Sequence, residues 1–518
     1  MIYDFANAIV TNVGRVRARH AYFLPFSDIG VCLDGGKNTF VSDRTFSLNG
    51  EWGASFLPLH AASVDTLNVE FAPVTVPFDG RGYVNKDGES EEECLLLEKD
   101  FEVFGAERRH FVSIDGVVGD FQVFVNGKFV GSSDLGSGEF DISGLLIEGT
   151  NALLLRVCRP SIDFDERIPG VYGNVLLEVK SDAFLTDYDF VCERNDATLV
   201  GTLTVTAEGK EGLALSVVFA DGEEIISEET AVFENGKATV SFSGAFKTYS
   251  AEKPDLYDAY VRLMDGEEEK ECSFLSLGFA PVSVAENVIK IDSVNVKIKG
   301  AVYCPNGIKD YDDETEIAKS FNLNALYVKG EAAPFFYETC AKNGLYVINE
   351  LPFSFEHKEK TERARKEETE SEEVFFAEKA ASLVKKTKNY PCVIGYSFGA
   401  LCETENGKEI CKKLSAESGK AVAGVNLTIL SGVSCEGGAV IAFAPGDKIQ
   451  PKELEAIVSD PEIAGVIIDG FGGEGTDGNG LFDEHNVAKE SAQITKYAFR
   501  PFTASLADNR TLLLTNRN

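Results

Sequence analysis

Acidic side chains at the ends of apolar runs are the residues in this sequence best suited to chemistry. Glu350 and Asp469 each end a run typical of a buried strand, while Glu403, Glu405 and Asp447 follow other such runs within a few residues. Two carboxyl groups held close together can act as a proton donor and as a base or nucleophile. We expect Glu350 and Asp469 to face the site where the strands end, in a structural or a catalytic role. In a chain this acidic, the other three are expected to be solvated loop carboxylates.

Histidine and cysteine give no sign of a metal site. The five histidines include no two at ligand spacing, and the eleven cysteines include no Cys-x-x-Cys pair. Cys158, Cys272 and Cys392 resemble single small hydrophobic residues inside strands or helices. Cys304 is either a reactive thiol or a buried filler, and the filler is favoured because no histidine lies near it in the sequence. We predict reduced thiols, no metal and no cofactor.

The charge balance excludes several classes of partner. Asp plus Glu number 84 against 49 Lys plus Arg, which gives a formal net charge of -35. A surface this acidic repels phosphate backbones, so nucleic-acid binding is not expected. No apolar run is long enough to span a bilayer, and residues 1–5 lack the features of a secretory signal. Together with reduced thiols, these features favour a cytoplasmic location.

The first half of the chain has the alternating pattern of β-sandwiches. Residues 121–125 alternate apolar and polar side chains and are followed by Asn126 and Gly127, a strong hairpin signal. The pattern continues to about Lys180 and predicts a first sandwich. A second run of alternating strands, over residues 181–277, has the length of an immunoglobulin-like sandwich.

After Gly278, short buried strands alternate with helical stretches such as residues 314–321 and 374–386. Repeated βα units predict a parallel sheet, and this many predict a (β/α)8 barrel of the TIM type. Seven strands can be found, not eight, so a barrel shortened by one strand is an alternative. The seven predicted strands are residues 296–300, 325–328, 345–348, 393–397, 427–430, 439–442 and 465–468.

Local motifs in this order resemble glycoside hydrolase family 2, which holds β-galactosidases, β-glucuronidases and β-mannosidases. The motifs are LNGEW at 48–52, SAEKPDLY at 250–257, NGLYVINE at 343–350 and KNYPCVI at 388–394. The resemblance implies a jelly-roll sandwich, an immunoglobulin-like sandwich and a TIM-type barrel. The corresponding ranges are 1–180 for the jelly roll, 181–279 for the second sandwich, 280–500 for the barrel and 501–518 for a tail resembling the start of a further β-domain.

The resemblance also implies where a catalytic pair would lie, and neither position is acidic. The family's acid/base follows the fourth barrel strand, where this chain has Ala400 and Leu401 in place of Asn and Glu. The nucleophile ends the seventh strand, where this chain has Ala442 or Phe443. Retaining glycosidases need two carboxyl groups about 5–5.5 Å apart. His357 lies near a family histidine, out of register by one, and is expected in an exposed loop.

Three functions remain open from the sequence. The favoured one is a catalytically inactive relative that uses its scaffold to bind carbohydrate, a β-glycoside, or to assemble with a partner. The second is an active glycosidase with relocated carboxylates, most simply Glu350 or Asp469 with Glu403; an inverting pair would need a gap of about 6.5–9.5 Å. The third is a structural subunit of a homo-oligomer.

Overall fold

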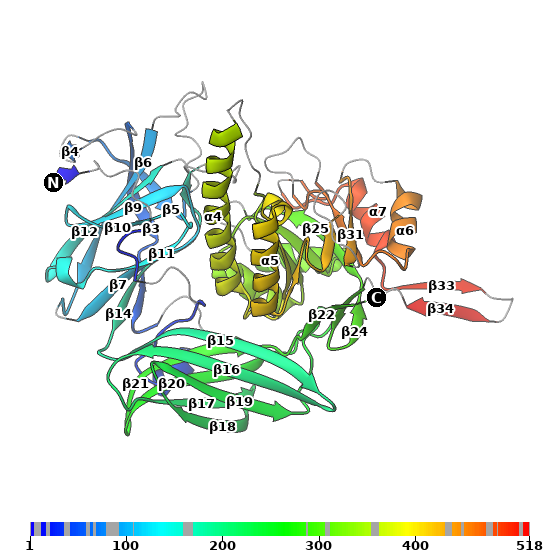
Figure 1. Ribbon diagram of the computed structural model, residues 1–518, viewed down its shortest axis with the longest axis horizontal. Helices are drawn as coiled ribbons and strands as arrows, with labels where there is room; N and C mark the ends of the chain where they lie inside the picture. Colours follow the sequence, from blue (N-terminus) through cyan, green and yellow to red (C-terminus); the bar gives the residue numbers. More distant parts are fainter. Residues whose placement is uncertain are drawn as a thin grey trace.

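The computed structural model places two β-sandwiches beside a parallel barrel (Figure 1). The first sandwich and the barrel lie side by side, and the second sandwich lies along both of them. The residues described are 2–4, 12–16, 21–35, 42–58, 63–65, 69–78, 93–106, 108–158, 169–285, 288–305, 311–353, 362–429, 438–446, 450–472, 480–483, 485–506 and 511–516.

The first sandwich packs two antiparallel sheets face to face. In the described residues its strand orders are β10-β9-β12-β6-β3-β5 and β11-β7-β14-β2. Trp52 lies in the core between them and donates its indole N–H to the Leu48 carbonyl at 2.7 Å. The strands are β2 (Thr45–Ser47), β3 (Gly50–Pro58), β5 (Ala72–Val76), β6 (Glu93–Val103), β7 (Arg109–Ile114), β9 (Asp120–Val125), β10 (Lys128–Ser133), β11 (Gly138–Asp141), β12 (Gly149–Cys158) and β14 (Val175–Lys180).

The predicted hairpin at Asn126 and Gly127 is confirmed. Val125 of β9 pairs with Lys128 of β10, so the turn has two residues. Both turn residues have positive φ, +49° for Asn126 and +77° for Gly127. That is the left-handed conformation a two-residue turn needs to follow the strand twist, and Asn-Gly adopts it at little cost.

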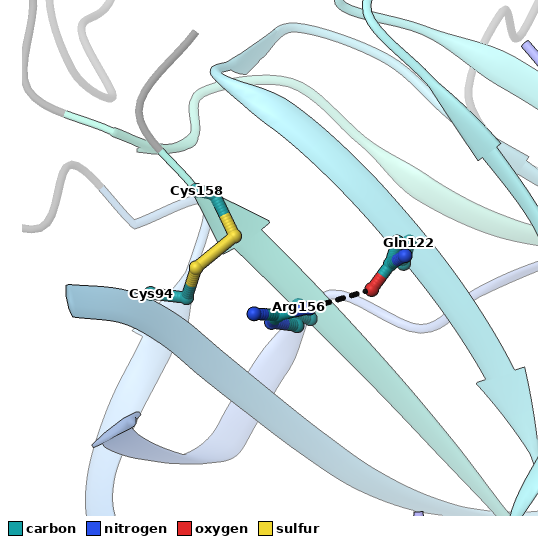
Figure 2. Close-up of a disulfide and its surroundings, with 4 residues drawn as sticks. All are labelled: Cys94, Gln122, Arg156 and Cys158. Atoms are coloured by element: carbon teal, nitrogen blue, oxygen red, sulfur yellow. Dashed lines mark hydrogen bonds between the residues drawn. A yellow bond between two sulfur atoms is a disulfide. The ribbon is translucent and has the colours of Figure 1, made fainter. Parts of the chain in front are cut away.

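A disulfide between Cys94 and Cys158 corrects the prediction of reduced thiols (Figure 2). It joins the neighbouring strands β6 and β12, with a Cα–Cα distance of 4.4 Å. Cys158 is therefore not the single small hydrophobic residue that its surroundings in the sequence suggested. Disulfides persist mainly in oxidising compartments, so this bond weakens the argument for a cytoplasmic location.

The second sandwich also has two antiparallel sheets. In the described residues their orders are β15-β16-β19 and β18-β17-β20-β21. An N-terminal segment lies on the second of them: Phe26 pairs with Cys272 of β21, and the short helix α1 (Ile29–Asp34) follows it. The strands are β15 (Phe184–Asn195), β16 (Thr198–Glu208), β17 (Ala214–Asp221), β18 (Glu224–Val232), β19 (Lys237–Gly244), β20 (Tyr257–Asp265) and β21 (Glu268–Leu277).

The barrel has eight parallel strands among the described residues, in the order β29-β28-β27-β26-β25-β32-β31-β30. A bridge between Ala423 and Leu427 joins the two ends of this sheet. All seven predicted strands are confirmed, and the eighth, β29, was missed. The (β/α)8 prediction therefore holds, and the alternative of a barrel shortened by one strand is wrong. The strands are β25 (Ile298–Tyr303), β26 (Ala325–Lys329), β27 (Tyr346–Glu350), β28 (Val393–Ser397), β29 (Ala421–Val422), β30 (Leu427–Ile429), β31 (Ala439–Ala444) and β32 (Gly465–Ile468).

Helices cover much of the outer wall of the barrel. They are α2 (Tyr311–Ser320), α3 (Pro334–Asn343), α4 (Glu362–Thr387), α5 (Glu405–Ser418), α6 (Pro451–Ser459) and α7 (Glu490–Ala498). The two predicted helical stretches lie in α2 and α4. Residues 423–426 alone separate β29 from β30, which is too short a connection for a covering helix. Within the described residues, each helix is too short or too polar to cross a membrane.

Smaller sheets complete the fold. The strands β22 (Val282–Ala285), β23 (Val288–Ile291) and β24 (Val294–Val296) pack against the barrel through Ile289 and Ile291. The hairpin of β33 (Phe502–Leu506) and β34 (Leu512–Asn516) projects away from the barrel (Figure 1). Two-stranded pairs in the first sandwich region are β1 (Ile2–Asp4) with β4 (Ser63–Asp65), and β8 (Val117–Val118) with β13 (Gly170–Val171).

The C-terminal end of α4 joins the barrel to both sandwiches. Lys386 of this helix donates to the hydroxyl of Ser137, which belongs to the first sandwich. Asn389 lies just after the helix and accepts from the backbone N–H of Phe190 at 3.0 Å. Its amide nitrogen donates to the Tyr188 carbonyl at 3.0 Å. Because both bonds are made to the backbone of β15, they fix the position of the barrel relative to this strand of the second sandwich.

Candidate functional site at the barrel mouth

The mouth of the barrel, where its parallel strands end, is the place where enzymes of this architecture hold their reacting groups. Tyr327 of β26 and Phe443 of β31 meet edge to face there, with ring centroids 5.2 Å apart. β25 and β32 lie between these two strands in the sheet, so the contact crosses the interior of the barrel. The register then places Glu350 and Ser397 on the same inner face, because Tyr327 pairs with Ile348 and Glu350 pairs with Ser397.

Hydrogen bonds connect the polar side chains on this inner face. The Tyr327 hydroxyl donates to Glu350 Oε1 at 2.9 Å. The hydroxyl of Ser397 in turn hydrogen-bonds to Tyr327. Ser397 and Tyr327 are buried, while Glu350 is half-buried. Three neighbouring strands thus supply one polar chain from Ser397 through Tyr327 to the Glu350 carboxyl.

Burial raises the pKa of Glu350 above its ordinary value. The hydrogen bond from Tyr327 and the charge of Lys329 oppose this rise, since both favour the carboxylate. A carboxyl group with a raised pKa keeps its proton closer to neutral pH than a solvated one. Such a group can donate a proton or a hydrogen bond to a ligand oxygen.

The position that the resemblance assigns to the acid/base is buried in the barrel core. Leu401 lies in the 3-10 turn η3 (Gly399–Glu403), has 0% exposure and belongs to the hydrophobic core of the barrel. Ala400, beside it, donates its backbone N–H to the Phe353 carbonyl at 2.8 Å, and this bond ties the turn to the segment after β27. Gly407 of α5 packs so closely that a Cβ there would overlap the Leu401 carbonyl. The turn therefore has little room to present another side chain in this conformation.

On the seventh strand of the barrel, Phe443 and not Ala442 faces the interior. Phe443 touches Tyr327 across the barrel, and side chains alternate along a strand, so Ala442 points to the opposite face. Of the two residues considered from the sequence, Phe443 is thus the one on the inner wall. An aromatic ring there offers an apolar surface and no group that could attack a carbon.

The structure shows no contact between Glu350 and the other candidate acids that are described. Asp469 directly follows β32 and is exposed, and two strands separate β32 from β27 in the sheet. Glu403 is exposed at the end of η3. Glu405 is exposed on α5, where it pairs with Lys408 at 2.8 Å. Among the described residues, no hydrogen bond joins Glu350 to Asp469 or to Glu403. Asp447 lies outside the described residues.

The predictions for Cys304 and His357 can be compared with the structure in the same way. Cys304, just after β25, is exposed, so the expectation that it is a buried filler was wrong. His357 lies outside the described residues. In the described part of the chain, no group of three or more His, Cys, Asp or Glu side chains could hold a metal ion.

Sequence reasoning did not single out Tyr327 and Ser397 as site residues. Each lies inside a run of apolar or small residues. Ser397 precedes Ala400 and Leu401 in the segment that resembles the family's acid/base motif, but attention fell on the replaced positions and not on the serine. The signal that could have found them is positional, since parallel strands in register place the residue paired with Glu350 on the same face. That register cannot be read from one strand by itself.

Curated relatives with detectable sequence similarity include β-galactosidases. The protein from Streptococcus thermophilus is 26% identical over 308 residues, which cover 54% of this chain and 30% of the relative. The protein from Yersinia pestis (strain Angola) is 24% identical over 465 residues, which cover 76% of this chain and 43% of the relative. The chain thus spans less than half the length of these relatives. No protein-family model matches the chain.

Solved structures of similar fold include β-glucuronidases. The Bifidobacterium dentium enzyme, complexed with coumarin-3-O-glucuronide, superposes with a TM-score of 0.75 at 15% identity over 89% of this chain and 97% of that chain. The Ruminococcus gnavus enzyme, complexed with D-glucuronic acid, has a TM-score of 0.71 at 14% identity over 88% of this chain and 98% of that chain. At these identities the likeness establishes the fold.

Two sandwiches followed by a parallel barrel give this chain the multidomain fold of the β-glucuronidase structures. In sequence the chain is similar to β-galactosidases. Both findings agree with the resemblance to glycoside hydrolase family 2.

Proposed function

We propose that this chain binds β-glycosides at its barrel mouth without hydrolysing them. The observation that carries the proposal is the state of the two catalytic positions: Leu401 is buried in the apolar core, and Phe443 occupies the inner wall of the seventh strand. Hydrolysis with retention needs a proton donor and a nucleophile about 5–5.5 Å apart. Loss of one member of such a unit costs several orders of magnitude in rate, and here both are replaced.

The groups at the mouth suit a sugar ligand. Aromatic rings such as that of Phe443 pack against the apolar C–H faces of pyranose rings, and the Glu350 carboxyl can donate to or accept from hydroxyl groups. The related β-galactosidases and β-glucuronidases indicate a β-linked galactoside or glucuronide as the first ligands to test. A homo-oligomer and a cytoplasmic location remain predictions beside this proposal.

Hydrolysis with relocated carboxylates is the second candidate function. The raised pKa of Glu350 favours it, because a general acid must hold its proton near neutral pH. The second carboxyl would have to come from Asp469 or Glu403, both of which are exposed. A gap of about 6.5–9.5 Å would suit an inverting pair.

Binding and turnover assays on one preparation separate the two functions. The protein is produced in a host that lacks β-galactosidase, and aryl β-galactoside, glucuronide, mannoside and glucoside are tested for hydrolysis and, by titration calorimetry, for binding. We expect binding of at least one glycoside with no hydrolysis above background. The Glu350→Ala variant should bind about ten-fold more weakly or worse, equivalent to about 1.4 kcal/mol.

The control for binding is Glu405→Ala, which removes a carboxylate that is exposed on α5 and should leave affinity unchanged. The control for turnover is the double variant Glu350→Gln, Asp469→Asn. Hydrolysis by the unmodified protein that disappears in this double variant would establish the second function and overturn the first. Failure of all four glycosides to bind would also contradict the proposal.

A further inference from the structure

Two cysteine thiols lie close together where η3, the turn that contains Leu401, packs against α5. Cys402 belongs to η3, directly after Leu401, and Cys411 belongs to α5. Their sulfur atoms are 2.6 Å apart, and both side chains are buried, at 3% and 0% exposure. A disulfide bond measures about 2.05 Å between sulfurs, so these two atoms are close to bonding distance. Very little movement of either element would be needed to join them.

A second observation supports oxidation of this pair. The same chain already contains a disulfide, between Cys94 and Cys158 (Figure 2). By contrast, Cys392 lies buried in the same barrel core with its thiol directed at the Tyr337 carbonyl, 3.3 Å away.

We propose that Cys402 and Cys411 form a second disulfide, which fastens η3 to α5. The reaction is thiol–disulfide exchange with a small-molecule or protein disulfide. The thiolate of one cysteine attacks that disulfide and releases one thiol, and the second cysteine then attacks the mixed disulfide and releases the other. Two protein thiols are oxidised, one external disulfide is reduced to two thiols, and the protein's two protons pass to the released thiolates.

The bond would have a local effect on the barrel mouth. It would close a loop from Cys402 to Cys411 that contains Thr404, whose hydroxyl caps α5 by accepting from the Gly407 N–H at 3.0 Å. With this loop closed, η3 cannot swing away from α5, and Leu401 stays in the core. The proposal is separate from carbohydrate binding, since it concerns the covalent state of the chain and not its ligand.

Peptide mapping tests the proposal directly. The protein is equilibrated in a buffer of reduced and oxidised glutathione, denatured in N-ethylmaleimide without reductant, digested and analysed by mass spectrometry. We expect a cross-linked peptide pair that contains Cys402 and Cys411, lighter by two hydrogen atoms than the two reduced peptides together. It should occur in the same sample as the Cys94–Cys158 pair, with Cys392 fully alkylated as the single-thiol control.

A sample in which Cys94 and Cys158 are cross-linked while Cys402 and Cys411 are both alkylated would overturn the proposal. So would a map that links either cysteine to a different partner. The Cys402→Ser variant adds a second measurement, in which Cys411 should become alkylated. The wild-type map decides the question even where that variant folds poorly.

Discussion

At the scale of single residues, the Glu350 carboxyl at the mouth has an unusual environment for a charged group. Burial favours the protonated form of this carboxyl group. The hydrogen bond from the Tyr327 hydroxyl, at 2.9 Å, and the charge of Lys329 favour the ionised form. The net result is a raised pKa, so the group changes charge at a higher pH than a solvated glutamate. We therefore expect ligand binding that uses a neutral Glu350 to be strongest at acidic pH and to weaken as the pH rises.

Restoring a carboxylate at the family position should not restore hydrolysis. In the Leu401→Glu variant the new carboxyl would lie in the apolar core, without a partner in the described surroundings, and we expect a loss of roughly 3–5 kcal/mol in the free energy of unfolding. Urea unfolding measures this loss, and the aryl glycoside panel measures turnover. Leu512→Glu is the matched control, because that leucine is 59% exposed and should tolerate the change. Turnover by the Leu401→Glu variant would contradict this account.

At the scale of elements, the contact between α5 and η3 depends on one glycine. A methyl group at Gly407 would overlap the backbone of Leu401, so Gly407→Ala should push the helix from the turn and destabilise the protein by about 1–3 kcal/mol. Gly144→Ala is the control, since no atom lies within 4 Å of a Cβ at that position. Thermal unfolding of both variants checks the prediction, and equal melting temperatures would refute it.

The strand β21 carries a buried glutamate that should make stability depend on pH. Burial raises the pKa of Glu271 to about 8, from an ordinary value of 4.5. Above pH 4.5 the unfolded chain releases this proton while the folded chain keeps it, so the Glu271 contribution to stability falls as the pH rises toward 8. Glu271→Gln should remove this fall and be the more stable protein at pH 8, by a few kcal/mol.

Urea unfolding at pH 5 and pH 8 measures the effect of Glu271. Glu268→Gln changes an exposed residue of the same strand and serves as the control. If the Glu271→Gln variant and the unmodified protein lose stability in parallel between these pH values, the glutamate is not the cause.

Strands and helices could be predicted from the sequence where their pattern of apolar residues extended over several positions. An element of only two residues could not be recognised. The seven predicted barrel strands each extend over four or five residues with recurring apolar side chains, whereas β29 consists of Ala421 and Val422, too few residues to show a period. The Cys94–Cys158 disulfide joins residues 64 positions apart, and such pairings cannot be read from spacing. The order of the motifs indicated a non-acidic residue, Leu401, at the position implied for the acid/base. Which of Ala442 and Phe443 faces the barrel interior could not be read from the sequence, because it follows from the contact of Phe443 with Tyr327 in the folded barrel.

At the scale of the whole molecule, the two bonds of Asn389 hold the barrel to the second sandwich. Asn389→Ala would leave the Phe190 N–H and the Tyr188 carbonyl without this partner in a buried contact, at a cost of about 2–3 kcal/mol. Urea unfolding should show the second sandwich separating from the barrel at a lower concentration. Asn195→Ala, which alters an exposed residue of the same β15 strand, should leave unfolding unchanged. Identical unfolding curves for both variants would contradict a joining role.

The projecting hairpin of β33 and β34 has a consequence for handling the protein in solution. Phe502, Leu512, Leu513 and Leu514 are each more than half exposed, and in the described part of the chain the outer edges of the hairpin have no neighbouring strand. Such edges recruit further strands from other molecules and begin aggregation. The net charge of -35 makes the molecules repel one another at low ionic strength. In 1 M salt the screening length of that repulsion falls to about 3 Å. Concentrated stocks should therefore stay clear in dilute buffer and turn cloudy on salting.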